Sequence, residues 1–198
     1  ESLARILEFS GYDILRVNYQ GDIGPHVAKC LWGILNLKLK RPEKDRLRWL
    51  GQVYAKANEK SKDNAKTEEE IRVMTKHLYE SDKKLMALWM RTRKWCLDDF
   101  NKIYKDFDVK FNRLYFESEV EKIGKEISRK LVDEGITKIS ESAVIANLEQ
   151  YGLGVLVLVR NDGVALYGAK DIGLLQLKLK EYRKIDKRMK TVFGVKKF

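Results

Sequence analysis

A strand, a tight turn and a helix follow one another near the carboxyl end of the sequence, and this succession limits the fold more than any other feature. Val155–Val159 is an unbroken apolar run, and Asp162-Gly163 supplies a turn that tolerates positive φ. We expect an extended segment over Val164–Tyr167, ended by Gly168, and a helix that opens at Asp171. A strand followed directly by a helix is typical of α/β folds, which bind ligands at the carboxyl edge of the sheet.

Tyr167 and Asp171 are the candidate ligand contacts of this segment. A carboxylate offers two acceptors to a guanidinium or ammonium group, and a tyrosine offers a π-face and a hydroxyl. The pair could therefore hold a cationic ligand. The alternative is structural: Asp171 complements the helix dipole, and Tyr167 is an aromatic residue on an edge strand. The residues by themselves leave both interpretations open.

The charge of the chain favours a polyanionic partner. Its 198 residues include 40 Lys and Arg against 29 Asp and Glu, a formal net charge of +11 at pH 7. An excess of this size favours nucleic acid. The alternative is a surface rich in Lys and Glu of the kind found in thermophiles, because 35% of the residues are charged.

Cysteine, histidine and apolar patterning argue against several other classes. Cys30 and Cys96 are isolated, which argues against zinc and predicts buried thiols in a reducing compartment. His26 and His77 are the only histidines and lie far apart in sequence, so we expect no metal site. No apolar run approaches the roughly 20 residues that cross a bilayer, and no signal peptide opens the chain. We therefore expect no membrane contact and a cytoplasmic protein.

Apolar residues spaced by three or four predict helices, and short apolar runs predict strands. In chain order these patterns predict a helix that ends at Gly11, a strand over Asp13–Tyr19, a helix over Val27–Leu39, a helix that begins at Pro42, one long helix over Ile71–Phe107 that Asp82 interrupts, an extended piece over Val109–Phe116, a helix over Ser118–Gly135, and short strands over Ile136–Ile139 and Ala143–Ala146. Capping boxes are expected at Thr67–Glu70 and Ser118–Glu121.

This order indicates a sheet domain that an insertion interrupts. We expect residues 1–39 to form the first part of an α/β core, residues 40–150 a mostly helical insertion, and residues 151–198 the second part of the core. Asn18, Asp22 and His26 lie on a polar loop at a strand end, where α/β folds place ligand sites. The alternative is an Asx-type turn made by Asn18 and Asp22, with His26 as a helix cap.

Two stretches of the chain resemble the archaeal-type arginyl-tRNA synthetases, which are class I enzymes. They are Asn18-Tyr19-Gln20-Gly21-Asp22-Ile23-Gly24-Pro25-His26 and Asp162-Gly163 through Tyr167 to Lys170-Asp171-Ile172. The resemblance implies a Rossmann-type class I synthetase catalytic core interrupted by a large, mostly helical insertion. It assigns Tyr167 and Asp171 to the arginine pocket, where the aspartate meets the guanidinium.

The function implied by the resemblance is arginine–tRNA ligation. L-arginine, ATP and tRNA are the implied partners, with Mg²⁺ accompanying the nucleotide and no zinc or other tightly bound cofactor. The insertion resembles the connective insertion that seats the tRNA acceptor end, and Arg91, Arg93 and Lys94 beside Trp95 are candidates for contact with tRNA phosphates. The alternative for these three is a solvated helix face. The alternative for the chain is a non-catalytic tRNA-binding module derived from a synthetase domain.

The chain departs from the family pattern in several places. The family's histidine-glycine nucleotide box would lie upstream of Glu1, and its lysine-serine loop and anticodon-binding domain would also lie outside the chain. We therefore expect an incomplete catalytic domain without pyrophosphate exchange of its own. Thr191–Phe198 resembles the strand that carries an arginine-contacting glutamine, but it contains none. Lys170 stands where many relatives have arginine. A lysine keeps the positive charge but lacks the planar guanidinium with its paired donors.

Overall fold

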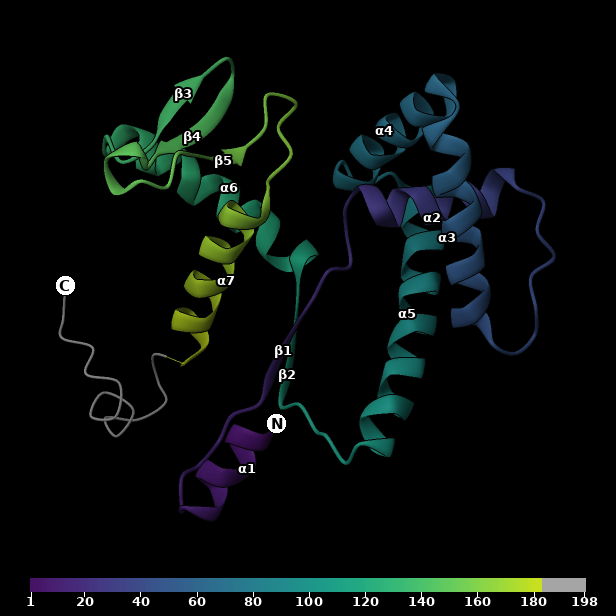
Figure 1. Ribbon diagram of the computed structural model, residues 1–198, viewed down its shortest axis with the longest axis horizontal. Helices are drawn as coiled ribbons and strands as arrows, with labels where there is room; N and C mark the ends of the chain where they lie inside the picture. Colours follow the sequence, from purple (N-terminus) through teal and green to yellow (C-terminus); the bar gives the residue numbers. More distant parts are fainter. Residues whose placement is uncertain (183–198) are drawn as a thin grey trace. The chain divides into compact units, whose positions relative to one another are not determined.

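The computed structural model describes residues 1–182, which divide into two compact units (Figure 1). The first unit is Glu1–Glu117, and the second begins at Ser118. Both units combine helices with strands, which confirms the prediction of a mixed α/β protein. The predicted extended run Thr191–Phe198 lies outside the described residues.

Four helices of the first unit pack together as a bundle. They are α2 (Pro25–Asn36), α3 (Arg46–Lys62), α4 (Ala65–Tyr79) and α5 (Lys83–Asp106). Helix α2 crosses both α3 and α4 (Figure 1). Apolar side chains fill the spaces between the helices, in one cluster around Leu31 and Trp89 and in another around Trp49 and Val53.

A parallel two-stranded ribbon completes the first unit. Strand β1 (Val17–Gln20) pairs with β2 (Arg113–Phe116), with Val17 opposite Arg113 and Gln20 opposite Phe116. Parallel strands need a long crossover connection, and here that connection contains α2, α3, α4 and α5. Helix α1 (Ser2–Phe9) precedes β1 and ends before Gly11, whose φ of 88° confirms the predicted stop.

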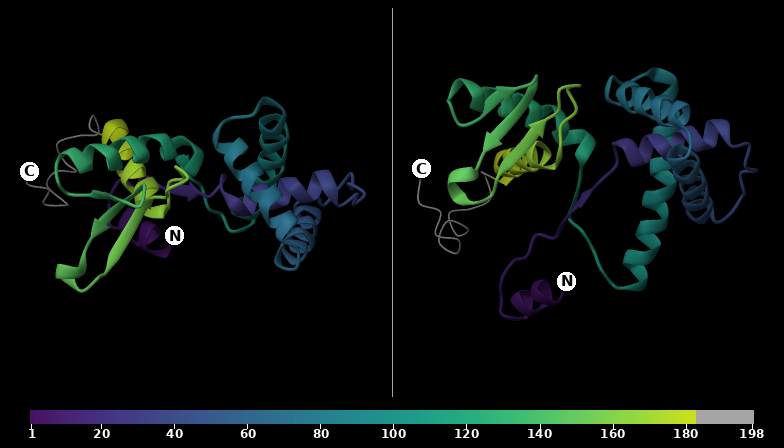
Figure 2. Two further views of the ribbon diagram at one scale, coloured as in Figure 1. Left: turned by 90° about the horizontal axis from the view of Figure 1, so that it is seen from above. Right: turned by 45° about the horizontal axis from the view of Figure 1, so that its top comes forward.

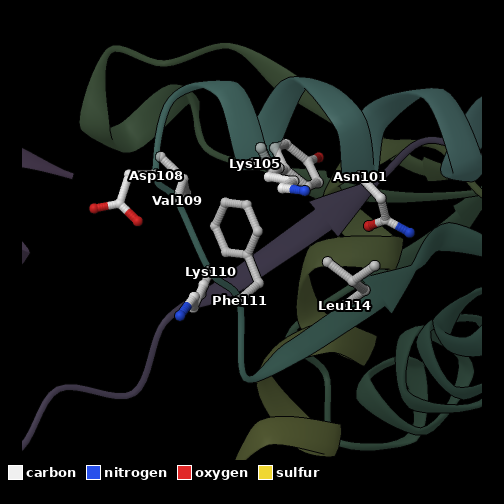
Figure 3. A pocket seen from close by; sticks show the side chains of 8 residues that line it. Asn101, Lys105, Asp108, Val109, Lys110, Phe111 and Leu114 are labelled. Carbon is white, nitrogen blue, oxygen red and sulfur yellow. The ribbon is translucent and has the colours of Figure 1, made fainter.

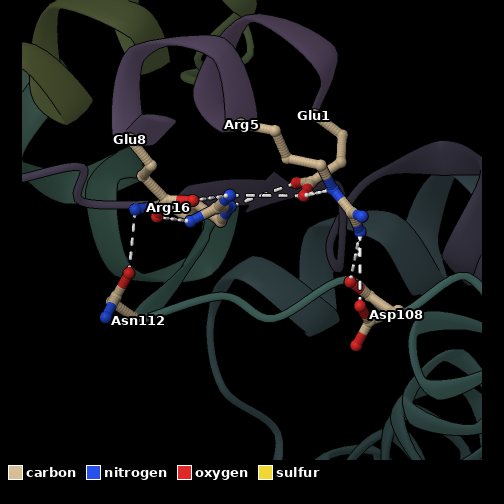
Figure 4. Close-up of polar contacts among 6 residues, drawn as sticks. All are labelled: Glu1, Arg5, Glu8, Arg16, Asp108 and Asn112. Atoms are coloured by element: carbon tan, nitrogen blue, oxygen red, sulfur yellow. Dashed lines mark hydrogen bonds and ion pairs between the residues drawn. The ribbon is translucent and has the colours of Figure 1, made fainter. Parts of the chain in front are cut away.

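An ion cluster around Arg16 links α1 to the start of β1 and to the segment before β2 (Figure 4). The Arg16 guanidinium donates to Glu1 Oε2 at 3.1 Å and to Glu8 Oε2 at 2.8 Å. Arg5 donates to the backbone oxygen of Asp108 at 2.8 Å. Most of these side chains are exposed to solvent, so the cluster orients α1 and contributes little to the free energy of unfolding.

The second unit is a three-stranded antiparallel sheet with two helices packed on it (Figure 2). The strands are β3 (Lys138–Ser140), β4 (Ala143–Asn147) and β5 (Val155–Val159), a 3-10 turn η1 (Glu149–Tyr151) joins β4 to β5, and the helices are α6 (Glu117–Asp133) and α7 (Tyr167–Tyr182). Val144, Leu158 and Val159 of the sheet form the core with Ala165 and Ala169, and Val132 and Ile172 of the helices pack against them.

Three helix starts differ from the sequence prediction. Helix α3 begins at Arg46, so the prediction that Pro42 is its first residue is wrong. Helix α4 begins before Thr67, because the Asn64 side chain caps it and accepts from the Thr67 amide at 3.0 Å. Helix α6 already includes Ser118, so Ser118 is not its cap.

The single long helix predicted over Ile71–Phe107 is wrong, because the structure has two helices there. Asp82 separates α4 from α5 and caps α5, accepting from the amides of Lys84 at 3.1 Å and Leu85 at 2.9 Å. Ser81, just before it, has a φ of 61°, a left-handed conformation that cannot continue a helix. Strand β1 is also shorter than predicted, because it begins at Val17 and not at Asp13.

For the strand–turn–helix segment, the predicted strand and turn are confirmed, but the predicted start of the helix is wrong. Strand β5 coincides with the predicted apolar run, and Gly163 has a φ of 81°. Tyr167 is not extended, because the Leu166 carbonyl accepts from the Lys170 amide at 3.1 Å and starts α7 there. Asp171 therefore lies in the second turn and not the first. Strand β5 pairs antiparallel with β4.

Candidate functional site

Two amides of β1 converge on one tyrosine of α5. Asn18 Nδ2 lies 3.2 Å from the Tyr104 hydroxyl oxygen, and Gln20 Nε2 lies 3.0 Å from it. Residues two apart on a strand project from the same face, which brings both amides to this hydroxyl. Asn18 thus contacts α5 and does not form the Asx-type turn considered as an alternative.

The Tyr104 ring also lines an open pocket of about 440 Å³ at the end of α5 (Figure 3). Its ring packs edge-on against Phe111 with 4.9 Å between the centroids. Lys105, Asp108 and Lys110 line the pocket around the two aromatic rings, so it has an apolar floor and charges of both signs at its rim. Sequence reasoning missed Tyr104, Gln20 and this pocket.

Asp22 and Arg93 form an ion pair, although the sequence analysis placed them in two different candidate sites. Arg93 Nε lies 3.0 Å from Asp22 Oδ2, and the Asp22 side chain is only 5% exposed. The Arg93 guanidinium carbon lies 3.7 Å from the centroid of the Phe116 ring and 5.0 Å from that of Trp89. Trp89 Nε1 donates to the Asp22 backbone oxygen at 2.6 Å. The loop after β1 is therefore tied to α5 by an ion pair and by a side-chain hydrogen bond to its backbone, while Arg93 also stacks on Phe116 of β2.

His26 lies in the first turn of α2 and is exposed. Gly24 is the N-cap of this helix, Pro25 follows it, and no side chain caps the first turn. The alternative role of His26 as the cap of α2 is therefore wrong. The φ of 133° at Gly24 is a conformation that a side chain would strain, which explains a glycine at this helix start.

Tyr167 and Asp171 lie four residues apart on α7, so they occupy the same helix face. The Tyr167 side chain is 70% exposed, and Asp171 is exposed as well. Lys170 is 5% exposed, and its Nζ lies 5.8 Å from the Tyr167 ring centroid. The exposed face of α7 thus offers an aromatic ring and a carboxylate one turn apart, and a lysine lies under the ring.

The other face of α7 is held against α6 without any intervening side chain. Gly173 is buried, and a β-carbon placed on it would stand 2.4 Å from the carbonyl oxygen of Val120. Ala169, one turn earlier, is fully buried as well. This contact determines which face of α7 remains free for Tyr167 and Asp171.

The predicted cluster of Arg91, Arg93 and Lys94 is divided among three different contacts. Arg93 pairs with Asp22 as described, and Lys94 pairs with Asp98 at 2.7 Å. Arg91 is exposed, and its guanidinium carbon lies 5.9 Å from the Trp95 ring centroid. Sequence reasoning missed Arg41 and Arg46, which also approach Trp95. The spacing of Arg91 and Trp95 signals that contact, but nothing in the sequence places Arg41 and Arg46 beside it.

Cofactor-binding groups are sparse in the part of the chain that the structure describes. No three His, Cys, Asp or Glu side chains among residues 1–182 come together as a metal-binding group. Burial raises the pKa of Cys30 to about 12 and also raises that of Cys96, so both thiols stay protonated near neutral pH. None of the helices in residues 1–182 combines the length and apolar composition needed to span a bilayer.

Comparison with known proteins connects these features to one family. The family model described as tRNA synthetases class I (R), catalytic domain, matches residues 1–194. The arginine–tRNA ligase of Bdellovibrio bacteriovorus is 34% identical over 199 residues, which cover 97% of this chain and 34% of that protein. The arginine–tRNA ligase of Treponema denticola is 32% identical over 180 residues, covering 87% and 30%. The chain thus spans about a third of the length of the curated relatives it matches.

Solved structures share the fold. The arginyl-tRNA synthetase from Plasmodium falciparum matches with a TM-score of 0.68 at 21% identity, over 90% of this chain and 30% of that one. A putative arginyl-tRNA synthetase from Campylobacter jejuni matches with a TM-score of 0.56 at 16% identity, over 90% of this chain and 39% of that one.

Proposed function

We propose that the chain is one segment of an arginine–tRNA ligase, because it belongs to the family of class I arginyl-tRNA synthetase catalytic domains. The observation that carries this proposal is the family match, which extends over residues 1–194. In the proposed reaction the carboxylate of L-arginine attacks the α-phosphate of ATP and releases pyrophosphate. The terminal ribose hydroxyl of tRNA then takes the arginyl group from the adenylate, and AMP leaves.

Within this function, Tyr167 and Asp171 are proposed to bind the side chain of arginine. The exposure of both residues and their spacing of one helical turn support this role. The Asp171 carboxylate would accept two guanidinium hydrogen bonds, and the tyrosine ring would lie against the cation. Proteins of this class do little covalent chemistry themselves, so the positions of such groups govern the rate.

The loop after β1 is proposed to border the reacting groups. Asn18 is held in place by Tyr104, and Asp22 is held by Arg93. His26, four residues after Asp22, is exposed in the first turn of α2. No residue is assigned to Mg²⁺, because residues 1–182 bring no three acidic, histidine or cysteine side chains together. ATP and magnesium remain predictions for the intact enzyme.

The finer description of the enzyme is also proposed. It includes a Rossmann-type core made from residues 1–39 and 151–198, a connective insertion over residues 40–150, and a cytoplasmic location. The archaeal-type assignment stays a prediction, and the curated relatives named above are bacterial. The non-catalytic tRNA-binding module is not favoured, because those relatives are arginine–tRNA ligases.

Isothermal titration calorimetry of the 198-residue chain with L-arginine tests the pocket. We expect saturable binding that Asp171→Ala abolishes. Citrulline, which has the same shape but no positive charge, should bind far more weakly, because a carboxylate left without its charged partner is costly to desolvate.

The matched control is Asp133→Ala, which removes an exposed aspartate from α6 in the same unit and should leave arginine binding unchanged. The assignment fails if Asp171→Ala binds arginine as the parent chain does, or if citrulline binds equally well. Aminoacylation by the intact ligase provides the second measurement, in which Asp171→Ala should lower kcat/KM for arginine.

A further inference from the structure

Three arginine side chains gather around the indole ring of Trp95 in the first unit. The guanidinium carbon of Arg46 lies 4.9 Å from the ring centroid, that of Arg41 lies at 5.8 Å, and that of Arg91 lies at 5.9 Å. Arg41 precedes α3, Arg46 is the first residue of α3, and Arg91 belongs to α5. We call these four residues the Trp95 arginine cluster.

The indole ring is anchored, and it can therefore hold the guanidiniums in place. Trp95 packs against the core cluster formed by Trp49, Leu50 and Val53. Planar guanidiniums stack well on aromatic faces, which fixes their orientation before any ligand arrives.

The positive charge of the cluster is not neutralised by the protein. Within residues 1–182 none of the three guanidiniums forms an ion pair with a carboxylate. Two aspartates on the next turn of α5 are already engaged, Asp98 with Lys94 and Asp99 with Lys102. Three like charges on one ring repel each other, and contact with the ring offsets only part of that repulsion.

The start of α3 adds to the same excess of positive charge. The first turn of α3 contains no acidic residue, and Asp45 before it makes no side-chain hydrogen bond to the helix amides. A helix begins at the positive end of its dipole, where an anion is stabilising and an arginine is not. The Arg46 Nε is buried and has no hydrogen-bond partner among the described residues. An anion bound beside the cluster would be stabilised by the guanidiniums and by the positive end of the helix dipole.

We propose that the Trp95 arginine cluster binds phosphate groups of an RNA backbone. The proposal rests on the proposed function, which makes tRNA the macromolecular substrate, and it identifies where on the first unit the RNA is held. Guanidinium forks match phosphate oxygens in pairs, and the net charge of +11 favours a polyanion. An acidic protein segment is the competing ligand, and the experiment separates the two.

Fluorescence anisotropy of a labelled arginine tRNA transcript, titrated with the 198-residue chain over a series of salt concentrations, tests the proposal. The variants are Arg41→Gln and Arg91→Gln, since both side chains are exposed. Each should weaken binding and reduce the slope of log K against log salt by roughly 0.7 to 0.9, the loss expected for one phosphate contact. Arg91→Lys should restore most of the slope, because it keeps the charge.

Arg72→Gln is the matched control. It removes one positive charge from an exposed arginine of α4 that is already bound to Glu69 at 2.7 Å. This variant should keep the parent slope. The proposal is overturned if Arg41→Gln and Arg91→Gln bind the tRNA with the parent slope and affinity. It is also overturned if they lose affinity for polyglutamate but not for tRNA.

Calorimetry with L-arginine on the same variants separates this proposal from the proposed function. Unchanged arginine binding together with a reduced salt slope supports both. If the parent chain binds arginine but the salt slopes of the variants are unchanged, the proposal for the Trp95 arginine cluster is overturned and the proposed function is not. Absence of arginine binding in the parent chain, with the slopes reduced as expected, supports the cluster and counts against the arginine pocket.

Discussion

A β-carbon placed on Gly124 of α6 would stand 2.0 Å from the carbonyl oxygen of Ala169 in α7. No real side chain tolerates such an approach, so the two helices touch backbone to backbone at this point. Gly173 of α7 makes the reciprocal contact with Val120. The crossing therefore depends on a glycine from each helix, and it positions the helix that carries Tyr167 and Asp171.

Replacing Gly124 by Ala should lower the free energy of unfolding by about 1 to 3 kcal/mol, because the obstacle is rigid backbone and cannot move aside as a flexible side chain would. Urea denaturation followed by circular dichroism measures the change. Gly51→Ala in α3 is the control, because its β-carbon would meet no atom within 4 Å. That variant should gain about 0.5 to 1 kcal/mol from helix propensity. Equal effects at the two positions would contradict the close crossing.

The Asp22–Arg93 pair should couple strongly in a double-mutant cycle. Because the Asp22 side chain is 5% exposed and that of Arg93 25%, solvent screens their attraction poorly. Asp22→Asn and Arg93→Gln, alone and combined, should give a coupling free energy of about 1 to 3 kcal/mol by urea denaturation. The exposed pair of Lys94 and Asp98 should couple by no more than about 0.5 kcal/mol. Equal coupling free energies in the two pairs would contradict the burial of the Asp22–Arg93 pair.

Arg16 should control the titration of two glutamates. Its hydrogen bond, aided by that of Arg5, lowers the pKa of Glu1 from 4.5 to about 2, and its hydrogen bond to Glu8 lowers the pKa of that carboxyl too. Because the folded-state pKa is the lower one, the stabilisation is present above pH 4.5 and is lost as the pH falls towards 2.

Carboxyl ¹³C NMR of the parent chain and of Arg16→Gln measures this effect. The substitution should move the Glu1 and Glu8 midpoints upward, towards the value of 4.5. Glu69, whose pKa is lowered by its hydrogen bond to Arg72 and not by Arg16, serves as the internal reference and should keep its midpoint. Identical titration curves in the two proteins would contradict the cluster drawn in Figure 4.

Local signals in the sequence were sufficient for many elements of the fold. Strand β5 coincides with the apolar run Val155–Val159, and the turn at Asp162-Gly163 is present. The stop of α1 at Gly11 was also predictable, because a glycine adopts the left-handed conformation there without strain. Two of the wrong predictions concern side-chain caps: Asn64 and not Thr67 caps α4, and Asp82 caps α5 where a longer apolar period predicted one continuous helix.

In the candidate sites, too, some features follow from local sequence patterns and others only from tertiary packing. The sequence by itself singled out Tyr167 and Asp171 as a pair, but their shared helix face follows from the start of α7 at Tyr167, which the sequence did not predict. Only the tertiary structure decided that Asp22 meets Arg93 and that Arg41 and Arg46 lie beside Trp95. Helical and strand periods act over a few residues, whereas these partners lie tens of residues apart. Their meeting depends on how whole helices pack, and no local pattern encodes that.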